Sequence, residues 1–117
     1  MYIGQISEIT GASRRAIRHY EELGLLKDMV RSGSYRIYNE KHIVTISMIK
    51  RAQVLGFTLA DITPLILAKQ TERDFPLAVA NSTIDKKRDQ IKLEIKKAKE
   101  LDLALVSLKE DIKIMFS

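Results

Sequence analysis

The sequence has 117 residues, of which 45% are hydrophobic and 30% are charged, with only five Gly and two Pro. This composition is typical of one folded, helix-rich domain and excludes a disordered or collagen-like chain. Cysteine is absent, which excludes disulfides, iron–sulfur clusters and thiolate zinc sites. The sequence contains no apolar run of about 18 residues and no secretory signal. We therefore expect a cytoplasmic protein that does not interact with membranes.

The formal net charge of +5 is unevenly distributed along the chain. Residues 1–57 contain nine Lys and Arg against five Asp and Glu, whereas residues 58–117 contain 11 against 10. A basic N-terminal half joined to a mixed-charge half favours a polyanion as the partner of the first half.

Two short helices are predicted at the N-terminus. Isoleucine at every third position from Ile3 to Ile9 predicts a helix that ends near Gly11, a residue suited to a left-handed C-cap. Ser13 is a favourable N-cap for a second helix over 14–23. Short helices joined in this way form a helix-turn-helix.

A small hairpin, or wing, is predicted over 25–38. Apolar and polar residues alternate weakly in this segment. The alternation is interrupted by Arg31-Ser32-Gly33-Ser34, and the segment ends in Tyr35-Arg36-Ile37-Tyr38. Further helices are predicted over 39–55 and 58–69.

The N-termini of these two later helices have recognisable caps. Asn39 is a plausible N-cap of the first, and Thr58 with Asp61 resembles a capping box at the start of the second. Pro64 is expected to kink the second helix or break its first turn.

The polar residues 70–74 and the following Phe75-Pro76 predict a linker, which divides the chain into a head, 1–75, and a helix, 76–117. Hydrophobic residues recur at heptad spacing along this helix, which we expect from about Leu77 to Ile112. A helix folded back on its own head is one interpretation, but the narrow stripe and the charged remaining faces favour a dimerising coiled coil. The residues of this seam are Ile84, Ile91, Ile95, Ala98, Leu101, Leu105, Leu108, Ile112 and Met115.

Arginines are concentrated at the start of the second helix. Arg14 and Arg15 oppose the helix dipole there, so helix stability does not explain them. The first residues of a recognition helix face base edges and phosphates, which favours DNA as the partner. In the wing, Arg31 and Arg36 flank the tip and suit phosphate contact.

Simpler interpretations exist for each of these side chains. Arg18 can belong to a solvated basic face and pair with Glu21 or Glu22, and His19 can be a spectator on the surface. Tyr20 is predicted to lie half in the core with its hydroxyl free to reach a phosphate. Tyr35 and Tyr38 can simply pack the hairpin on the head, which is the favoured interpretation for Tyr38.

The run IGQISEITGASRRAIRHYEELGLL, then RSGSYRIY, a helix ending VLGFTLADI and a long heptad helix resemble the MerR family of bacterial transcriptional regulators. The resemblance covers essentially the whole chain. It implies a mainly α fold, with a winged helix-turn-helix head followed by a long C-terminal helix that forms an antiparallel coiled-coil dimer. It also implies that the homodimer binds a palindromic promoter in double-stranded DNA and distorts it for RNA polymerase. The DNA-binding residues expected on these grounds are Ser13, Arg14, Arg15, Arg18, His19, Tyr20, Arg31, Tyr35 and Arg36.

Sensing chemistry is where the sequence departs from known branches of this family. Metal-sensing members place cysteines at the end of the long helix and beyond it, and the redox-sensing member holds an iron–sulfur cluster there, whereas this chain has no Cys. His19 and His42 lie in different elements without a carboxylate cluster, so we expect no metal and no cofactor.

Other functional classes fit the sequence less well. Scattered acids and the lack of a Gly-rich phosphate loop do not indicate an enzyme. An architectural or excisionase-like winged-helix DNA-binding protein would not need the heptad helix. A coiled-coil interaction module would not need the arginines of the second helix.

Overall fold

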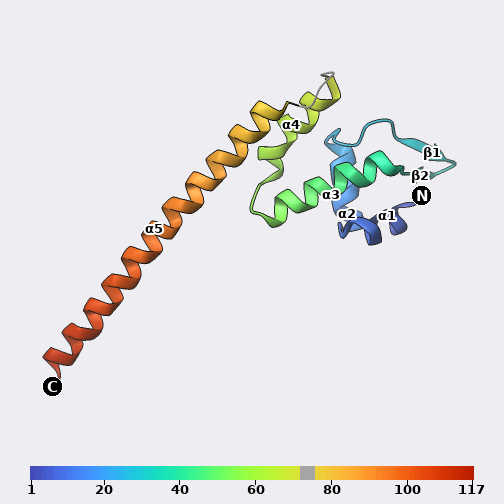
Figure 1. Cartoon of the computed structure of the whole chain (residues 1–117). Coiled ribbons are helices and arrows are strands. Elements are labelled where there is room, and N and C mark those ends of the chain that lie inside the picture. The colour runs from blue at the N-terminus through green and yellow to red at the C-terminus, as the bar shows by residue number, and fades with distance from the viewer. Residues whose placement is uncertain (72–75) are drawn as a thin grey trace. The chain divides into compact units, whose positions relative to one another are not determined.

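A computed structural model describes residues 1–71 and 76–117 (Figure 1). Its contacts divide the chain into two compact units, Met1–Val79 and Ala80–Ser117. Most of the predicted linker, 72–75, lies outside the described residues. Of the described residues of this linker, Gln70 and Thr71 belong to a helix instead, whereas Pro76 lies outside the helices.

The first unit begins with the predicted helix-turn-helix, made of α1 (Ile3–Thr10) and α2 (Arg14–Glu22). Gly11 caps α1 with φ of 75°, the left-handed conformation that glycine adopts without a Cβ penalty. The Ser13 hydroxyl accepts a hydrogen bond from the Ala16 backbone N–H at 3.0 Å, which caps α2. Both predicted helices and both caps are confirmed, although α2 ends one residue earlier than expected.

A two-stranded wing follows, made of β1 (Val30–Ser32) and β2 (Tyr35–Ile37). The strands are antiparallel, and Arg31 pairs with Arg36 in the ladder. The predicted hairpin is confirmed, but its ladder is shorter than the segment 25–38. Leu25 and Leu26 lie in the hydrophobic core instead of in a strand.

Two more helices, α3 (Glu40–Val54) and α4 (Leu59–Thr71), complete the head. Asn39 caps α3 as predicted, and His42 completes its capping box. The Thr58 N–H donates to Asp61 Oδ2 at 2.9 Å, and the Asp61 N–H donates to Thr58 Oγ1 at 3.2 Å. This confirms the second capping box.

The expectation that Pro64 breaks the first turn of α4 is wrong, because the helix is continuous through this residue. Pro64 removes one hydrogen bond to the carbonyl of Ala60. Both residues are exposed, so water can solvate that carbonyl, and the capping box holds the preceding turn in place.

One hydrophobic core joins these elements. It fixes the orientation of α2 against the wing and α3, and thereby positions the predicted DNA contacts. Its buried members are Ile6, Ala12, Ile17, Tyr20, Leu25, Leu26, Tyr38, Ile46, Ile49 and Ile62.

The last helix, α5 (Leu77–Met115), has 39 residues and is therefore about 58 Å long at ~1.5 Å per residue. It ends three residues beyond the predicted Ile112. All nine residues of the predicted seam are exposed in the single chain, so the chain alone does not bury this stripe. No helix in the described part of the chain is both long and apolar enough to cross a membrane.

Candidate nucleic-acid interface

The first two turns of α2 present their arginines to solvent. Ile17 and Tyr20 face the core, at 0% and 2% exposure, so the helical period turns Arg14, Arg15 and Arg18 outward. The guanidinium of Arg14 lies over α1, because a Cβ added to Gly4 would be 2.7 Å from its Nη2 atom. Gly4 therefore leaves room for this side chain, a role that no sequence motif revealed.

Tyr20 does not have the free hydroxyl that the sequence predicted. The hydroxyl donates a hydrogen bond to Gln53 Oε1 on α3 at 2.7 Å, and burial raises the pKa of Tyr20. This expectation is wrong because the acceptor lies 33 residues away in the sequence. Tyr20 thus anchors α2 to α3 through its hydroxyl.

The acids after Arg18 pair with other residues. Glu21 binds Arg36 of the wing, whose Nε lies 2.7 Å from Oε1 and 2.6 Å from Oε2. Glu22 lies 3.8 Å from Nδ1 of the exposed His19. Neither predicted ion pair with Arg18 occurs among the ion pairs of the described residues.

The bridge between Glu21 and Arg36 joins the end of the recognition helix to the second strand of the wing. The hydrogen bond from Arg36 to Glu21 is the main reason that the pKa of Arg36 is raised. The same bridge places the Glu21 carboxylate against the Arg36 guanidinium and largely balances its charge. The sequence did not predict this pairing.

Tyr38 is buried, with 1% of its surface exposed, which confirms the interpretation that it packs the hairpin on the head. Its hydroxyl has no hydrogen-bond partner among the residues the structure describes. Burial raises the pKa of Tyr38, and the nearby Glu21 carboxylate raises it further. The hydroxyl thus remains protonated at neutral pH and can act as a donor.

A pocket of about 100 Å³ lies between α1, α2 and the wing. Tyr35 is 67% exposed, and its ring packs against Tyr2 with a centroid distance of 5.7 Å. Sequence reasoning did not select Tyr2, because it belongs to no motif. The lining residues are Tyr2, Ile3, Arg18, Ser34, Tyr35, Arg36 and Tyr38.

The backbone of the first residue closes the base of the wing. The Tyr38 N–H donates to the Met1 carbonyl at 2.7 Å, and the Met1 ammonium donates to the Tyr38 carbonyl at 2.8 Å. Both backbone polar groups of Tyr38, its N–H and its carbonyl, are therefore hydrogen-bonded to Met1.

The two histidines do not form a metal site. The Nδ1 atom of the buried His42 accepts the Asn39 N–H at 3.1 Å, so its Nε2 carries the proton and donates to the Lys27 carbonyl. No group of three or more His, Cys, Asp or Glu in the described ranges is arranged to hold a metal ion.

A capped helix that presents arginines in its first turn, beside a two-stranded wing, defines a winged helix-turn-helix head. The family model for the MerR HTH family regulatory protein matches residues 1–69. A second model, described as MerR, DNA binding, matches residues 43–108. The chain belongs to the MerR family.

Relatives among curated proteins agree with this assignment. The HTH-type transcriptional regulator HmrR of Sinorhizobium medicae is 40% identical over 67 residues, which are 56% of this chain and 46% of that protein. The mercuric resistance operon regulatory protein of Bacillus cereus is 33% identical over 109 residues, 92% of this chain and 82% of that protein. The chain thus spans about half the length of the first of these relatives.

Solved structures share the fold. The transcription regulator PbrR691 from Ralstonia metallidurans, in complex with lead(II), superimposes with a TM-score of 0.74 at 25% identity over 94% of this chain and 86% of that chain. HiNmlR, a MerR family regulator lacking the sensor domain and bound to promoter DNA, superimposes with a TM-score of 0.65 at 21% identity over 86% and 76% of the two chains. The second likeness supports the fold alone.

Proposed function

We propose that the protein is a transcriptional regulator that binds promoter DNA as a homodimer through two winged helix-turn-helix heads. The observation that carries the proposal is the set of three exposed arginines in α2 beside a wing with further cations. A solvated basic face would not require Arg14 and Arg15 in the first turn, where they oppose the helix dipole. The alternatives without DNA binding leave these arginines unexplained.

We assign the DNA contacts to two groups. Side chains in the first turn of α2 reach base edges and set sequence preference, whereas Arg18 and the wing bind phosphates and position the head. The contacts proposed are Ser13, Arg14, Arg15, Arg18, His19, Arg31, Tyr35 and Arg36, without Tyr20.

The pocket beside the wing extends this assignment to Tyr38. Arg18 and Tyr38 both line this pocket, and we propose that a phosphate oxygen bound there meets the Arg18 guanidinium and the buried Tyr38 hydroxyl, which has no partner among the described residues. A charge-assisted hydrogen bond would satisfy this buried donor, for which the described part of the chain offers no acceptor.

We further propose that α5 pairs antiparallel with a second copy through the seam 84–115. The seam is exposed in the single chain, and its heptad spacing is the pattern that coiled coils bury. Leu105→Asp would place a charge without a partner in this interface and should give a monomer in sedimentation equilibrium. Leu93→Asp, at an exposed leucine outside the seam, should leave the dimer intact. A wild-type monomer at micromolar concentration would contradict the assembly.

Antiparallel pairing of helices about 58 Å long carries the heads to opposite ends of the dimer. Half-sites one turn apart require recognition helices only about 34 Å apart, so we expect half-sites nearer two turns apart. Any difference between the spacing of the two heads and the spacing of the half-sites in relaxed DNA is then taken up by bending or untwisting the central base pairs of the site. This distortion costs on the order of 1–6 kcal/mol. Such distortion is how the protein would control the use of the promoter by RNA polymerase.

A footprint on the promoter region next to its own gene tests this function. We expect two protected half-sites and enhanced cleavage between them. Uniform protection across the centre, or half-sites one turn apart, would argue for a related winged-helix DNA-binding protein without this mechanism. No protection at all would reject DNA binding to that region.

A further inference from the structure

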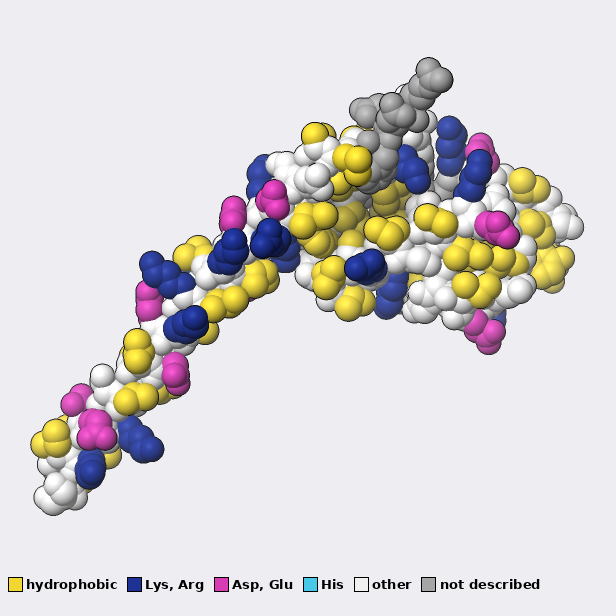
Figure 2. Space-filling view, in the orientation of Figure 1, with side chains coloured by type: hydrophobic (Ala, Val, Ile, Leu, Met, Phe, Trp, Pro, Cys, Tyr) yellow, Lys and Arg dark blue, Asp and Glu magenta, His cyan; other side chains and the backbone are white. Residues whose placement is uncertain are grey.

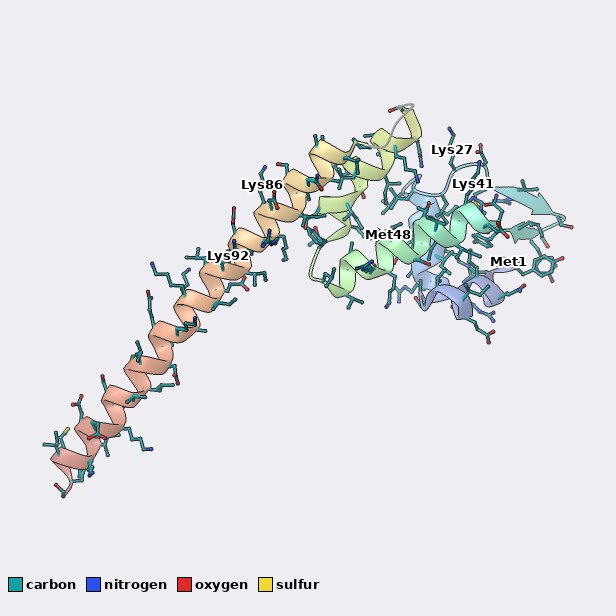
Figure 3. All side chains as sticks on the ribbon, in the orientation of Figure 1. Met1, Lys27, Lys41, Met48, Lys86 and Lys92 are labelled. Atoms are coloured by element: carbon teal, nitrogen blue, oxygen red, sulfur yellow. The ribbon has the colours of Figure 1, made fainter. Side chains whose placement is uncertain are left out.

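Tyr2 belongs to no sequence motif, yet its ring contacts the wing. The ring centroids of Tyr2 and Tyr35 are 5.7 Å apart, and the ring planes are inclined at 57°. Aromatic pairs favour offset or edge-to-face arrangements over a parallel stack, with centroids about 4.5–7 Å apart. Figure 2 shows hydrophobic side chains exposed at the wing end of the head, and Figure 3 labels Met1, which precedes Tyr2 and lies beside the wing. The ring contact joins the start of α1 to β2.

The backbone around Tyr2 is fixed by hydrogen bonds. Tyr2 is the N-cap of α1, and its carbonyl accepts the N–H groups of Gln5 at 3.1 Å and Ile6 at 3.2 Å. The preceding Met1 forms two backbone hydrogen bonds with Tyr38. The Tyr2 side chain itself makes no capping hydrogen bond, so helix stability does not explain an aromatic residue here. The ring projects from a fixed backbone and is available to support a neighbour.

Tyr35 needs such a support. It begins β2 directly after the turn at the tip of the wing, and it is mostly exposed. The wing has only two strands of three residues, and an isolated two-stranded hairpin is marginally stable in water. Among the described residues, Tyr2 is the only one whose ring packs on Tyr35. Without Tyr2, the Tyr35 side chain would have to be ordered when DNA binds, and such ordering lowers affinity.

The two sides of β2 are held by different parts of the head. Successive side chains of a strand point to opposite faces, so Tyr35 and Arg36 lie on opposite sides of the ladder. The Arg36 side is held by the ion pair with Glu21 of α2, and the Tyr35 side is held by Tyr2 at the start of α1. The wing is thus joined to both helices of the helix-turn-helix.

We infer that Tyr2 is a positioning residue for DNA binding, which holds the Tyr35 ring in place for a phosphate contact. The assignment rests on the phosphate site of the proposed function. Both rings line the same pocket as Arg18 and Tyr38, so a fixed Tyr35 ring preserves the shape of that site before DNA arrives. An ordered site binds more tightly, because its side chains need not be immobilised on binding. Tyr2 acts through Tyr35 and not through its own hydroxyl.

Substitutions at position 2 test the ring and the hydroxyl separately. Tyr2→Ala should weaken binding to promoter and random duplex alike by about threefold to tenfold, the factor that an aromatic pair contributes. Tyr2→Phe keeps the ring, so its affinity should stay within about twofold of wild type. The slope of log affinity against log salt should not change in either variant, because no charge is removed. Fluorescence anisotropy measures both quantities, and equal losses in the two variants would overturn the positioning role.

A double-mutant cycle tests whether Tyr2 acts through Tyr35. Tyr35→Ala alone should weaken DNA binding by at least the same factor as Tyr2→Ala. In the Tyr35→Ala protein, adding Tyr2→Ala should cause less than about a twofold further loss, because the ring that Tyr2 supports is gone. Losses that multiply fully in the double variant would overturn the inference, since Tyr2 would then act independently of Tyr35.

Ile9→Ala is the matched control on α1. Ile9 is 52% exposed and does not line the pocket, so this variant should bind DNA like wild type. Urea unfolding should show that Tyr2→Ala remains folded, because Tyr2 is 55% exposed and makes no side-chain cap. A loss of affinity that Ile9→Ala shares, or that a lower unfolding midpoint accounts for, would overturn the assignment.

The results at Tyr35 and Arg18 separate this role from the proposed function. If Tyr35→Ala weakens DNA binding and Tyr2→Ala does not, only the role of Tyr2 is wrong. If neither Tyr35→Ala nor Arg18→Ala weakens binding, the proposed phosphate site is wrong, and the role of Tyr2 is wrong with it.

Discussion

Tyr38→Phe separates the role of a buried hydroxyl in folding from its role in DNA binding. The Tyr38 side chain is 1% exposed, and its hydroxyl has no partner in the described part of the chain. An unmade hydrogen bond at a buried donor costs roughly 1–3 kcal/mol. Removing the hydroxyl should therefore leave the free energy of unfolding unchanged or raise it by up to about 1 kcal/mol.

The expected effect on DNA binding has the opposite direction. A hydrogen bond to a charged group contributes roughly 1.5–3 kcal/mol, and about 1.4 kcal/mol is a factor of ten in affinity. If Tyr38 donates to a phosphate, Tyr38→Phe should weaken promoter binding by at least about tenfold per head. Random duplex should lose as much as the promoter, because phosphates carry no sequence information.

Tyr20→Phe is the matched control, because it removes a hydroxyl that has a partner. Loss of the bond to Gln53 should destabilise the head by roughly 0.5–1.5 kcal/mol. Since α2 keeps its core contacts, DNA affinity should change less than threefold.

Urea unfolding and fluorescence anisotropy at a fixed salt concentration measure the two quantities. The reasoning is refuted if Tyr38→Phe loses stability as Tyr20→Phe does and binds DNA with wild-type affinity.

Two further substitutions test the electrostatics and sterics of the interface. Gly4→Ala should raise the free energy of unfolding by roughly 0.5–1 kcal/mol because Ala favours a helix. It should also change base preference, because the new Cβ would lie 2.7 Å from Arg14 Nη2 and displace the guanidinium. Selection from a randomised operator library measures this preference, and an unchanged preference would exclude Arg14 as a base contact in its present position. Glu21→Gln should release the charge of Arg36 and make the plot of log affinity against log salt steeper by up to about one unit; an unchanged slope would mean that the released guanidinium does not reach a phosphate.

Features that depend on neighbouring residues were predictable from the sequence. The cap of Ser13 on Ala16 and the left-handed Gly11 each depend on residues within a turn, and so does the capping box between Thr58 and Asp61. The expectation of a broken first turn at Pro64 was wrong, because Ala60 is exposed and water can solvate the carbonyl that loses its hydrogen bond; the alternative of a kink stays a prediction.

Features that depend on tertiary packing were not predictable. Gln53 is 33 residues from Tyr20, and Arg36 is 15 residues from Glu21, so no local pattern selects either pair. Residue type alone suggested that both Tyr20 and Arg36 were free to meet DNA. Only the fold reveals that the first is satisfied and the second is paired.

The two missed bonds explain why the first turn of α2 suits DNA recognition. Both Tyr20 and Glu21 lie in the second half of α2, where they hold it to α3 and to the wing. The first half is held mainly by the Ser13 cap and by buried Ile17, so its arginines stay exposed without anchoring the helix. Anchoring and recognition are thus divided between the two ends of one short helix. A sequence reveals the recognition end, which needs only arginines at fixed positions after an N-cap, but it conceals the anchoring end, whose partners are chosen by the fold.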